Sequence, residues 1–537
     1  MKATSLLGMC LLTFTSMAQI KDLGQIDFPN SGSKEAQKDF ITGVLLLHSF
    51  EYEDAREAFQ AAQKIDPDFA MAYWGEAMTH NHPVWFRQYR EKGEEALNKL
   101  GDNMGVRITK AKTPKEQIWI TAVSTLFSDK GTKEERDFQY SKLMGEFYKQ
   151  FPEDQEIASF YALSIIGTSH KGRDIPIYMR AAEIVEKVYA LNPNHPGALH
   201  YLIHAYDDPG NATKGLNAAK NYSVVAPAAS HALHMPTHIF YALGMWDEMV
   251  KGNEESFEAA DARKKRKGLS LEARGYHAFW WLQYGYLQQG RFEKALDLLK
   301  EMEADAKESG SRRTRYHHTM MRAHYIVETD NWTSKVLKRD PDITGLYVDT
   351  YAADRFIIGM SAIKGGEVAR AKEVLDEMLE NRRYNTANKL DFDFATCHVG
   401  GENFGKLDPE EQAAAIMESM LEASIMLEEG YTERAYQMLD QATEAEDNMV
   451  FIFGPPSVVK PSHELFGEVL LEANRYSEAR EHFEKALLRA PKRMLSLRGL
   501  YRANRGLGDE SSANAVQTMM KEIRHSADEG VYPQSED

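Results

Sequence analysis

The sequence predicts an all-α solenoid, a chain of stacked helical hairpins that grows without a single central core. The first observation is an internal repeat: the segments from Gly43 to Pro67 and from Gly467 to Pro491 share Gly, Ala, Phe, Ala and Pro at equal spacings. The second is that few stretches alternate with period two, the pattern of half-buried strands. The third is the dominance of Ala, Leu, Glu and Lys, which favour helices.

The repeat has a period of 34 residues, the spacing from Pro193 to Pro227 and from Ala479 to Ala513. The pattern resembles the tetratricopeptide repeat (TPR). The resemblance implies a TPR-type α-solenoid of about twelve helical hairpins in a right-handed superhelix. In each hairpin it implies that small residues let two antiparallel helices approach closely and that the proline ends the second helix. The predicted hairpins start near residues 36, 70, 121, 155, 196, 230, 276, 316, 352, 416, 460 and 494.

Four segments are predicted along the chain: a signal peptide at 1–18, an N-terminal TPR array at 36–384, an irregular insertion or linker at 385–410, and C-terminal TPR repeats with a cap at 411–537. A basic start, a short apolar core and a small-x-small site ending at Ala18 indicate the signal. We therefore expect an exported protein, periplasmic or secreted.

Composition narrows the range of partners. The 64 basic and 81 acidic residues give a formal net charge of -17, which argues against nucleic acid because phosphate binding needs a basic surface. The basic run from Arg263 to Lys267 is expected to be a solvated loop. Cleavage of the signal would leave Cys397 as the single cysteine, so no intrachain disulfide is expected. We also expect no transmembrane segment. The sequence leaves the oligomeric state open.

Five histidines fall at matching places in two consecutive repeats. His200 and His204 precede His234 and His238 by one repeat, and His231 lies near the start of the second one. Residues four apart share a helix face, and packed helices lie roughly 10 Å apart, so the imidazoles are expected to converge. The TPR resemblance implies that they line the concave face. Equivalent places in other repeats hold Trp74, His82, His277, Trp280, Tyr284, His317 and His324.

Three interpretations of these side chains stay open. The histidines pack structurally, or they bind a metal, Zn or Cu, with Asp207 and Asp208 as ligands or orienting groups. In the third interpretation, histidines and aromatic residues form a groove for a peptide, an acidic partner or a carbohydrate. The motifs GxSxG, GxxxxGK[ST] and HExxH do not occur, and we predict no catalytic residue.

The function predicted first is an exported, non-catalytic scaffold that holds a protein, peptide or small polar ligand in its groove. The alternative is a metal-binding protein or metal-dependent enzyme centred on the five histidines, and the second alternative is carbohydrate-related binding. The segments "GALHYLIHAYDDP", "SHALHMPTHIF" and "FGPPSVVKPSHELFGEVLLEANRYSEA" also resemble a group of exported bacterial TPR proteins. That resemblance implies the fold and not a reaction.

Overall fold

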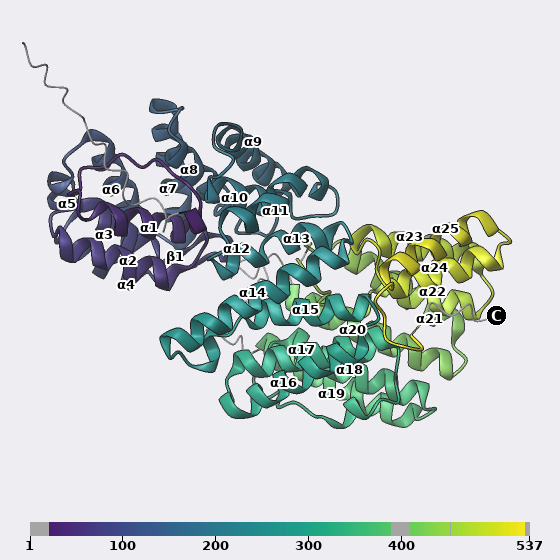
Figure 1. Ribbon diagram of the computed structural model, residues 1–537. Helices are drawn as coiled ribbons and strands as arrows, with labels where there is room; N and C mark the ends of the chain where they lie inside the picture. The colour runs from purple at the N-terminus through teal and green to yellow at the C-terminus, as the bar shows by residue number, and fades with distance from the viewer. Residues whose placement is uncertain (1–20, 388–408, 452, 532–537) are drawn as a thin grey trace, which may run out of the picture.

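The computed structural model describes residues 21–387, 409–451 and 453–531. Helices form nearly all of its regular structure (Figure 1), and the two short strands Asn81–His82 (β1) and Arg87–Gln88 (β2) pair as an antiparallel hairpin. The all-α prediction is therefore confirmed.

Three predictions, about the N-terminus, the single cysteine and the linker, fall wholly or mostly outside this description. The signal peptide at 1–18, Cys397 and most of the 385–410 linker are not among the described residues. None of the helices within the described ranges is long and apolar enough to cross a membrane.

Hairpins of antiparallel helices form the N-terminal part of the array, coloured purple to blue in Figure 1. Helix α6 begins at Pro114 rather than near the predicted 121, and the short helix α5 (Met104–Lys110) precedes it. The pairs are α1 (Gln37–His48) with α2 (Tyr52–Ile65), α3 (Ala70–Met78) with α4 (Arg90–Asn98), α6 (Pro114–Leu126) with α7 (Lys133–Gln150), α8 (Gln155–Ile166) with α9 (Ile175–Leu191), and α10 (Pro196–Tyr206) with α11 (Ala212–Val225).

These hairpins close on themselves, because α1 packs against α10 as well as against α2 and α3. At this seam His48 of α1 meets Gly197 of α10, where an added Cβ would lie 2.3 Å from His48 Nδ1. Tyr222 also donates a hydrogen bond to Ser49 across the seam, at 3.1 Å. The seam therefore requires glycine at 197, and closure turns the inner face into a core.

Trp74, which the sequence assigned to the groove, lies in this core. Its side chain is fully buried. Its ring centroid lies 5.1 Å from that of Trp119, 5.2 Å from that of Phe160 and 5.5 Å from that of Phe28. The chain itself thus fills the space in front of Trp74.

The remaining hairpins continue the array through the lower and right-hand parts of Figure 1. Helix α18 packs against α20, so the array continues in space across the residues outside the description. The pairs are α12 (Ser230–His234) and α13 (Pro236–Ala242) with α14 (Trp246–Lys267), α15 (Tyr276–Gln288) with α16 (Phe292–Ser309), α18 (Val348–Lys364) with α19 (Val368–Ala387), α20 (Pro409–Glu428) with α21 (Thr432–Asp447), α22 (Ser462–Glu472) with α23 (Tyr476–Arg489), and α24 (Met494–Gly506) with α25 (Glu510–Ile523).

The hairpin predicted near residue 316 is wrong in its second half. Helix α17 (Arg312–Thr329) is present, but it ends at Asp330, whose φ of 51° is left-handed. An irregular loop with the 3-10 turn η4 (Lys335–Lys338) follows. Arg322 of α17 donates to the carbonyl of Leu337 at 2.7 Å. This loop occupies the place of the predicted second helix, and α17 supplies donors for its backbone carbonyls.

The basic run at 263–267 is helical, and the loop expected there is wrong. It forms the end of α14, where Arg263 and Lys267 make ion pairs with Asp54 of α2. The distance from Lys267 Nζ to Asp54 Oδ1 is 2.7 Å. These ion pairs tie α14 back to the first hairpin, so the run serves packing.

The loop between α21 and α22 and the start of α24 pack against the inner face of α15. Gly454 approaches Trp281 so closely that a Cβ would lie 2.2 Å from the indole Cζ2. The fully buried Arg493 donates to the Tyr284 hydroxyl at 2.6 Å and to Glu464 at 2.8 Å. The C-terminal hairpins are therefore anchored on α15 through a buried charge.

Candidate metal centre

Six histidines meet where the closed N-terminal hairpins join the rest of the array. Helix α13 packs against both α10 and α14, and α14 packs against α15, so these elements form one neighbourhood. The histidines are His200 and His204 on α10, His231 and His234 on α12, His238 on α13, and His277 on α15.

Pro236 interrupts the helix that carries three of them. Proline lacks an N–H and its ring clashes with the carbonyl four residues earlier, so α12 ends at His234 and α13 begins at Pro236. The backbone passes the break through a hydrogen bond from the Met235 amide to the His231 carbonyl at 2.9 Å. Across this break the Nε2 atoms of His234 and His238 lie 3.2 Å apart.

The histidines form two groups of three, each with one ring nitrogen per residue within 4.8 Å of the others. The five histidines that the sequence selected for a metal all lie here, joined by His277, which the sequence assigned to the ligand groove. The groups adjoin, because the ring centroids of His204 and His238 lie 6.3 Å apart. We call them the α10 triad (His200, His204, His231) and the α13 triad (His234, His238, His277).

Aromatic rings enclose both triads. The Phe50 ring centroid lies 4.3 Å from that of His200, and the Trp281 centroid lies 4.4 Å from that of His238. His231 and His277 are half-buried, whereas the other four histidines are buried. His231 and His277 are therefore the least buried residues of their triads.

Burial disfavours the charged form of four of these imidazoles. It lowers the pKa of His234 to about 3, aided by the neighbouring His238. Burial likewise lowers the pKa values of His200, His204 and His231 well below 6.5. A neutral imidazole carries one nitrogen lone pair, which is the state that binds a metal.

Hydrogen bonds fix the proton positions in the α13 triad. His238 Nδ1 lies 2.5 Å from a carboxylate oxygen of Asp207, which can only accept. His234 Nδ1 lies 2.7 Å from Asn253 Oδ1, and the amide nitrogen of Asn253 donates to the Met249 carbonyl. Both Nδ1 atoms therefore carry the hydrogen, and in neutral rings two Nε2 lone pairs face each other. At 3.2 Å this arrangement needs a shared cation, either a proton or a metal ion.

The α10 triad has a different deficit. His200 Nδ1 donates to the His48 carbonyl at 2.6 Å, so its Nε2 is an acceptor, 3.2 Å from His231 Nε2. Both ring nitrogens of His204 are buried without a hydrogen-bond partner among the described residues. Leaving such a group unsatisfied costs about 1–3 kcal/mol.

A third group of metal-ligand residue types, His48, Glu156 and His195, is complete without an ion. Both imidazoles donate from Nε2 to Glu156, at 2.8 and 3.0 Å. Their Nδ1 atoms accept from the Tyr201 hydroxyl at 2.9 Å and from the Ala198 amide at 3.2 Å. Burial disfavours a charge on Glu156, but the two histidines outweigh burial and hold its pKa at about 2. This group therefore links α1, α8 and α10 structurally.

Other residues that the sequence assigned to the groove contact the chain itself. His82 stacks on Tyr52 with a centroid separation of 4.0 Å. His317 is buried, and its Nδ1 donates to the Arg313 carbonyl at 2.8 Å. Neither residue joins the two triads in the part of the chain that the structure describes.

Trp280, Tyr284 and His324 likewise lie inside the array. Trp280 donates to His324 Nδ1 at 3.1 Å, and His324 Nε2 donates to the Pro456 carbonyl at 3.0 Å. Tyr284 accepts from Arg493, as described above. At these positions the structure presents internal packing, and a ligand groove there stays a prediction.

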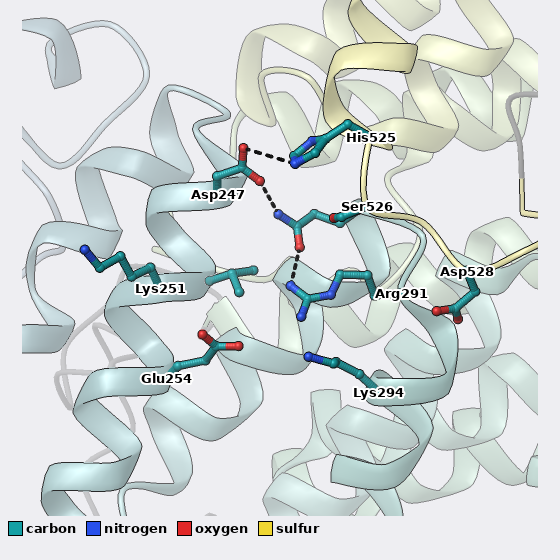
Figure 2. Close-up of a pocket in the computed structure, with 10 residues that line it drawn as sticks. Asp247, Lys251, Glu254, Arg291, Lys294, His525, Ser526 and Asp528 are labelled. Atoms are coloured by element: carbon teal, nitrogen blue, oxygen red, sulfur yellow. Dashed lines mark hydrogen bonds and ion pairs between the residues drawn. The ribbon is translucent and has the colours of Figure 1, made fainter.

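A cavity of 480 Å³ lies apart from the triads, between α14, the start of α16 and the C-terminal segment (Figure 2). Its polar groups pair with one another: Gln289 donates to Asp247 at 2.5 Å and accepts from Arg291 at 3.0 Å. His525 lies 4.0 Å from Asp247. These contacts hold the C-terminal segment against the array, and we assign no functional site to the cavity.

No protein-family model matches the sequence, and no curated protein matches it. Among solved structures, the chain is similar to yeast Tom70 at 13% identity and a TM-score of 0.32, over 92% of this chain and 93% of that one. It is similar to Ypp1 at 9% and 0.39, over 93% and 88%. It is also similar to a monomeric mutant of IFIT1 with Gppp-AAAA at 12% and 0.39, over 91% and 100%. At such values the function must be argued from the site.

Proposed function

We propose that this protein binds a transition-metal ion, zinc or copper, through His234, His238 and His277. The observation that supports this most is the 3.2 Å separation of the Nε2 atoms of His234 and His238, whose Nδ1 atoms both donate to oxygens. Zn–N bonds of about 2.0–2.1 Å at a tetrahedral angle place two ligand nitrogens about 3.3 Å apart. The two rings are thus spaced as two ligands of one ion.

The surroundings of the α13 triad also suit a metal. A ligating histidine usually donates its other ring N–H to a carboxylate or carbonyl, which fixes the ring and raises its basicity. Asp207 accepts this hydrogen bond from His238, and the side-chain carbonyl of Asn253 accepts it from His234. Three protein ligands leave a fourth position open, the pattern of catalytic zinc rather than closed structural zinc. This favours a metal that also binds water or a small ligand.

A shared proton is the competing explanation of the short Nε2–Nε2 distance, and metal analysis separates the two. The full-length protein is stripped with a chelator, dialysed and titrated with Zn²⁺ or Cu²⁺, and the bound metal is measured per chain. We expect metal that survives dialysis and raises the melting temperature, because a ligand specific to the native state stabilises it. The His234→Ala/His238→Ala variant should lose that metal.

The matched control is His482→Gln, which removes a partly buried histidine of α23 whose Nδ1 pairs with His463 at 2.8 Å, outside both triads. This variant should keep the metal. If the wild-type protein retains no metal and its melting temperature is unchanged by either ion, a shared proton is the explanation and the proposal fails.

We also propose, with less direct support than for metal binding, that the protein is exported and binds a partner. The apolar N-terminal stretch ending at Ala18 supports export. The solenoid architecture supports the binding of a protein or peptide, because stacked hairpins offer extended surfaces. A partner captured equally well by the wild type and by His234→Ala/His238→Ala would separate this role from metal binding.

A further inference from the structure

We infer that the α10 triad is a second metal site, so that two ions lie side by side in the six-histidine cluster. The inference goes beyond the proposed function, because it rests on His200, His204 and His231 and not on the ligands of the first ion. The ligand class is again a transition-metal ion that accepts imidazole nitrogen, zinc or copper.

His204 provides the first argument. Its side chain is 5% exposed, and neither ring nitrogen has a hydrogen-bond partner among the described residues. The ring lies between neighbours, with centroid distances of 4.8 Å to His200, 5.9 Å to Phe50 and 6.3 Å to His238. A metal ion would use the lone pair that this packing leaves without a donor.

His200 is held in the tautomer that a metal needs. Its Nδ1 donates to the His48 carbonyl at 2.6 Å, which leaves the Nε2 lone pair for an ion. His48 is itself fixed by Glu156 at 2.8 Å and Tyr201 at 2.9 Å. The structural group that closes the N-terminal hairpins therefore also orients a ligand, the support that metal-bound histidines usually have.

His231 completes the site from the next helix. Its Nε2 lies 3.2 Å from His200 Nε2, close to the spacing of about 3.3 Å expected for two nitrogens on one tetrahedral ion. Its backbone amide donates to Glu51 at 3.0 Å, which positions the start of α12. His231 is the least buried residue of the triad.

The comparison with the third group makes the assignment specific. In His48, Glu156 and His195 every ring nitrogen has a partner, so that group offers no lone pair. The ligand atoms of the α10 triad lie within the same limit of 4.8 Å, but all three of its residues are histidines and His204 is left without partners. Proximity of histidines is thus common to both groups, and only the α10 triad has free ligand atoms.

The test counts metal ions per chain in four forms of the full-length protein: wild type, His204→Gln, His238→Gln and the control His482→Gln. We expect two ions in the wild type and the control, and one ion in each of the other two. Thermal unfolding of each chelated protein checks that the variants fold. His204→Phe, which preserves the packing against Phe50 without a ligand atom, is the second variant for the α10 triad.

The remaining outcomes separate this inference from the proposed function. One ion in the wild type that persists in His204→Gln and is lost in His238→Gln would overturn the second site and leave the first. One ion that is lost in His204→Gln and persists in His238→Gln would support the α10 site and overturn the first. One ion lost in both variants would mean a single ion shared by the triads, and no ion would overturn both proposals.

Discussion

The Nε2 atoms of His234 and His238 lie 3.2 Å apart although Pro236 breaks the helix between them. At His234-Met235-Pro236 the proline interrupts what would otherwise be a continuous first helix of the repeat. It divides one predicted helix into α12 and α13, with one histidine of the pair on each. The proline therefore belongs to the geometry of the site as much as to the fold.

Pro236→Ala should weaken metal binding without destabilising the chelated protein. Alanine restores an amide donor and is the better helix former. A new backbone hydrogen bond at residue 236 would therefore shift one ring relative to the other. We expect the affinity for Zn²⁺ or Cu²⁺ to fall about tenfold or more. Isothermal titration with the exposed-site variant Pro227→Ala as control measures this. An unchanged affinity would show that the helix break at Pro236 is irrelevant to the site.

Asp207→Asn should reduce metal affinity through His238. The carboxylate accepts the Nδ1–H of His238 at 2.5 Å, and an amide is a weaker acceptor without the charge. Loss of such an orienting group typically costs 10–100-fold in metal affinity. The neighbouring variant Asp208→Asn is the control, because Asp208 pairs with Arg173 at 2.7 Å instead. Equal effects of the two variants would argue against the orienting role.

The histidine cluster could be predicted from the sequence because the same residues follow both the helix periodicity and the repeat period. His200 and His204 share one helix face, and the repeat carries that face to His234 and His238 on the next first helix. His277 has the same place in its repeat as His231, so the same reasoning was sufficient to include it. The aromatic signal of Trp280 beside it favoured a groove instead.

The burial of the inner face could not be predicted in the same way. It depends on the contact between α1 and α10, and His48 and Gly197 are far apart in sequence. A 34-residue pattern encodes only neighbouring hairpins. The loop that receives Trp281 and His324 is equally nonlocal. The proton positions that separate the three histidine groups also depend on such contacts.

Glu156→Gln should destabilise the whole protein. In the wild type two imidazole N–H donors share the buried carboxylate of Glu156. Glutamine would turn an N–H₂ group toward one of them, and that donor would lose its acceptor. We expect a loss of about 2–3 kcal/mol in the free energy of unfolding, measured by urea denaturation of the chelated protein. The exposed variant Glu153→Gln should change it by less than about 0.5 kcal/mol. Similar stability of both variants would contradict a structural role for this group.

Buried histidines should make the protein less stable in mild acid. Burial lowers the pKa of His324 to about 3 and that of His318 to about 4. Because these folded-state values lie below the unfolded value near 6.5, the unfolded chain takes up protons first. Stability is therefore full above pH 6.5 and is lost as the pH falls toward 4.

His324→Gln isolates one such contribution, because glutamine can still accept from Trp280 and donate to the Pro456 carbonyl. Below pH 6.5 a histidine that stays neutral only in the folded state costs about 1.4 kcal/mol per pH unit. Between pH 6.5 and 5 the wild type should therefore lose about 2 kcal/mol more than the variant does. Urea denaturation of the chelated proteins at pH 7, 6 and 5 measures the difference. This pH range lies above the titration of ordinary carboxylates, so they contribute little to the difference. If the free energies of unfolding of the two proteins changed in parallel with pH, His324 would already be protonated in the native state.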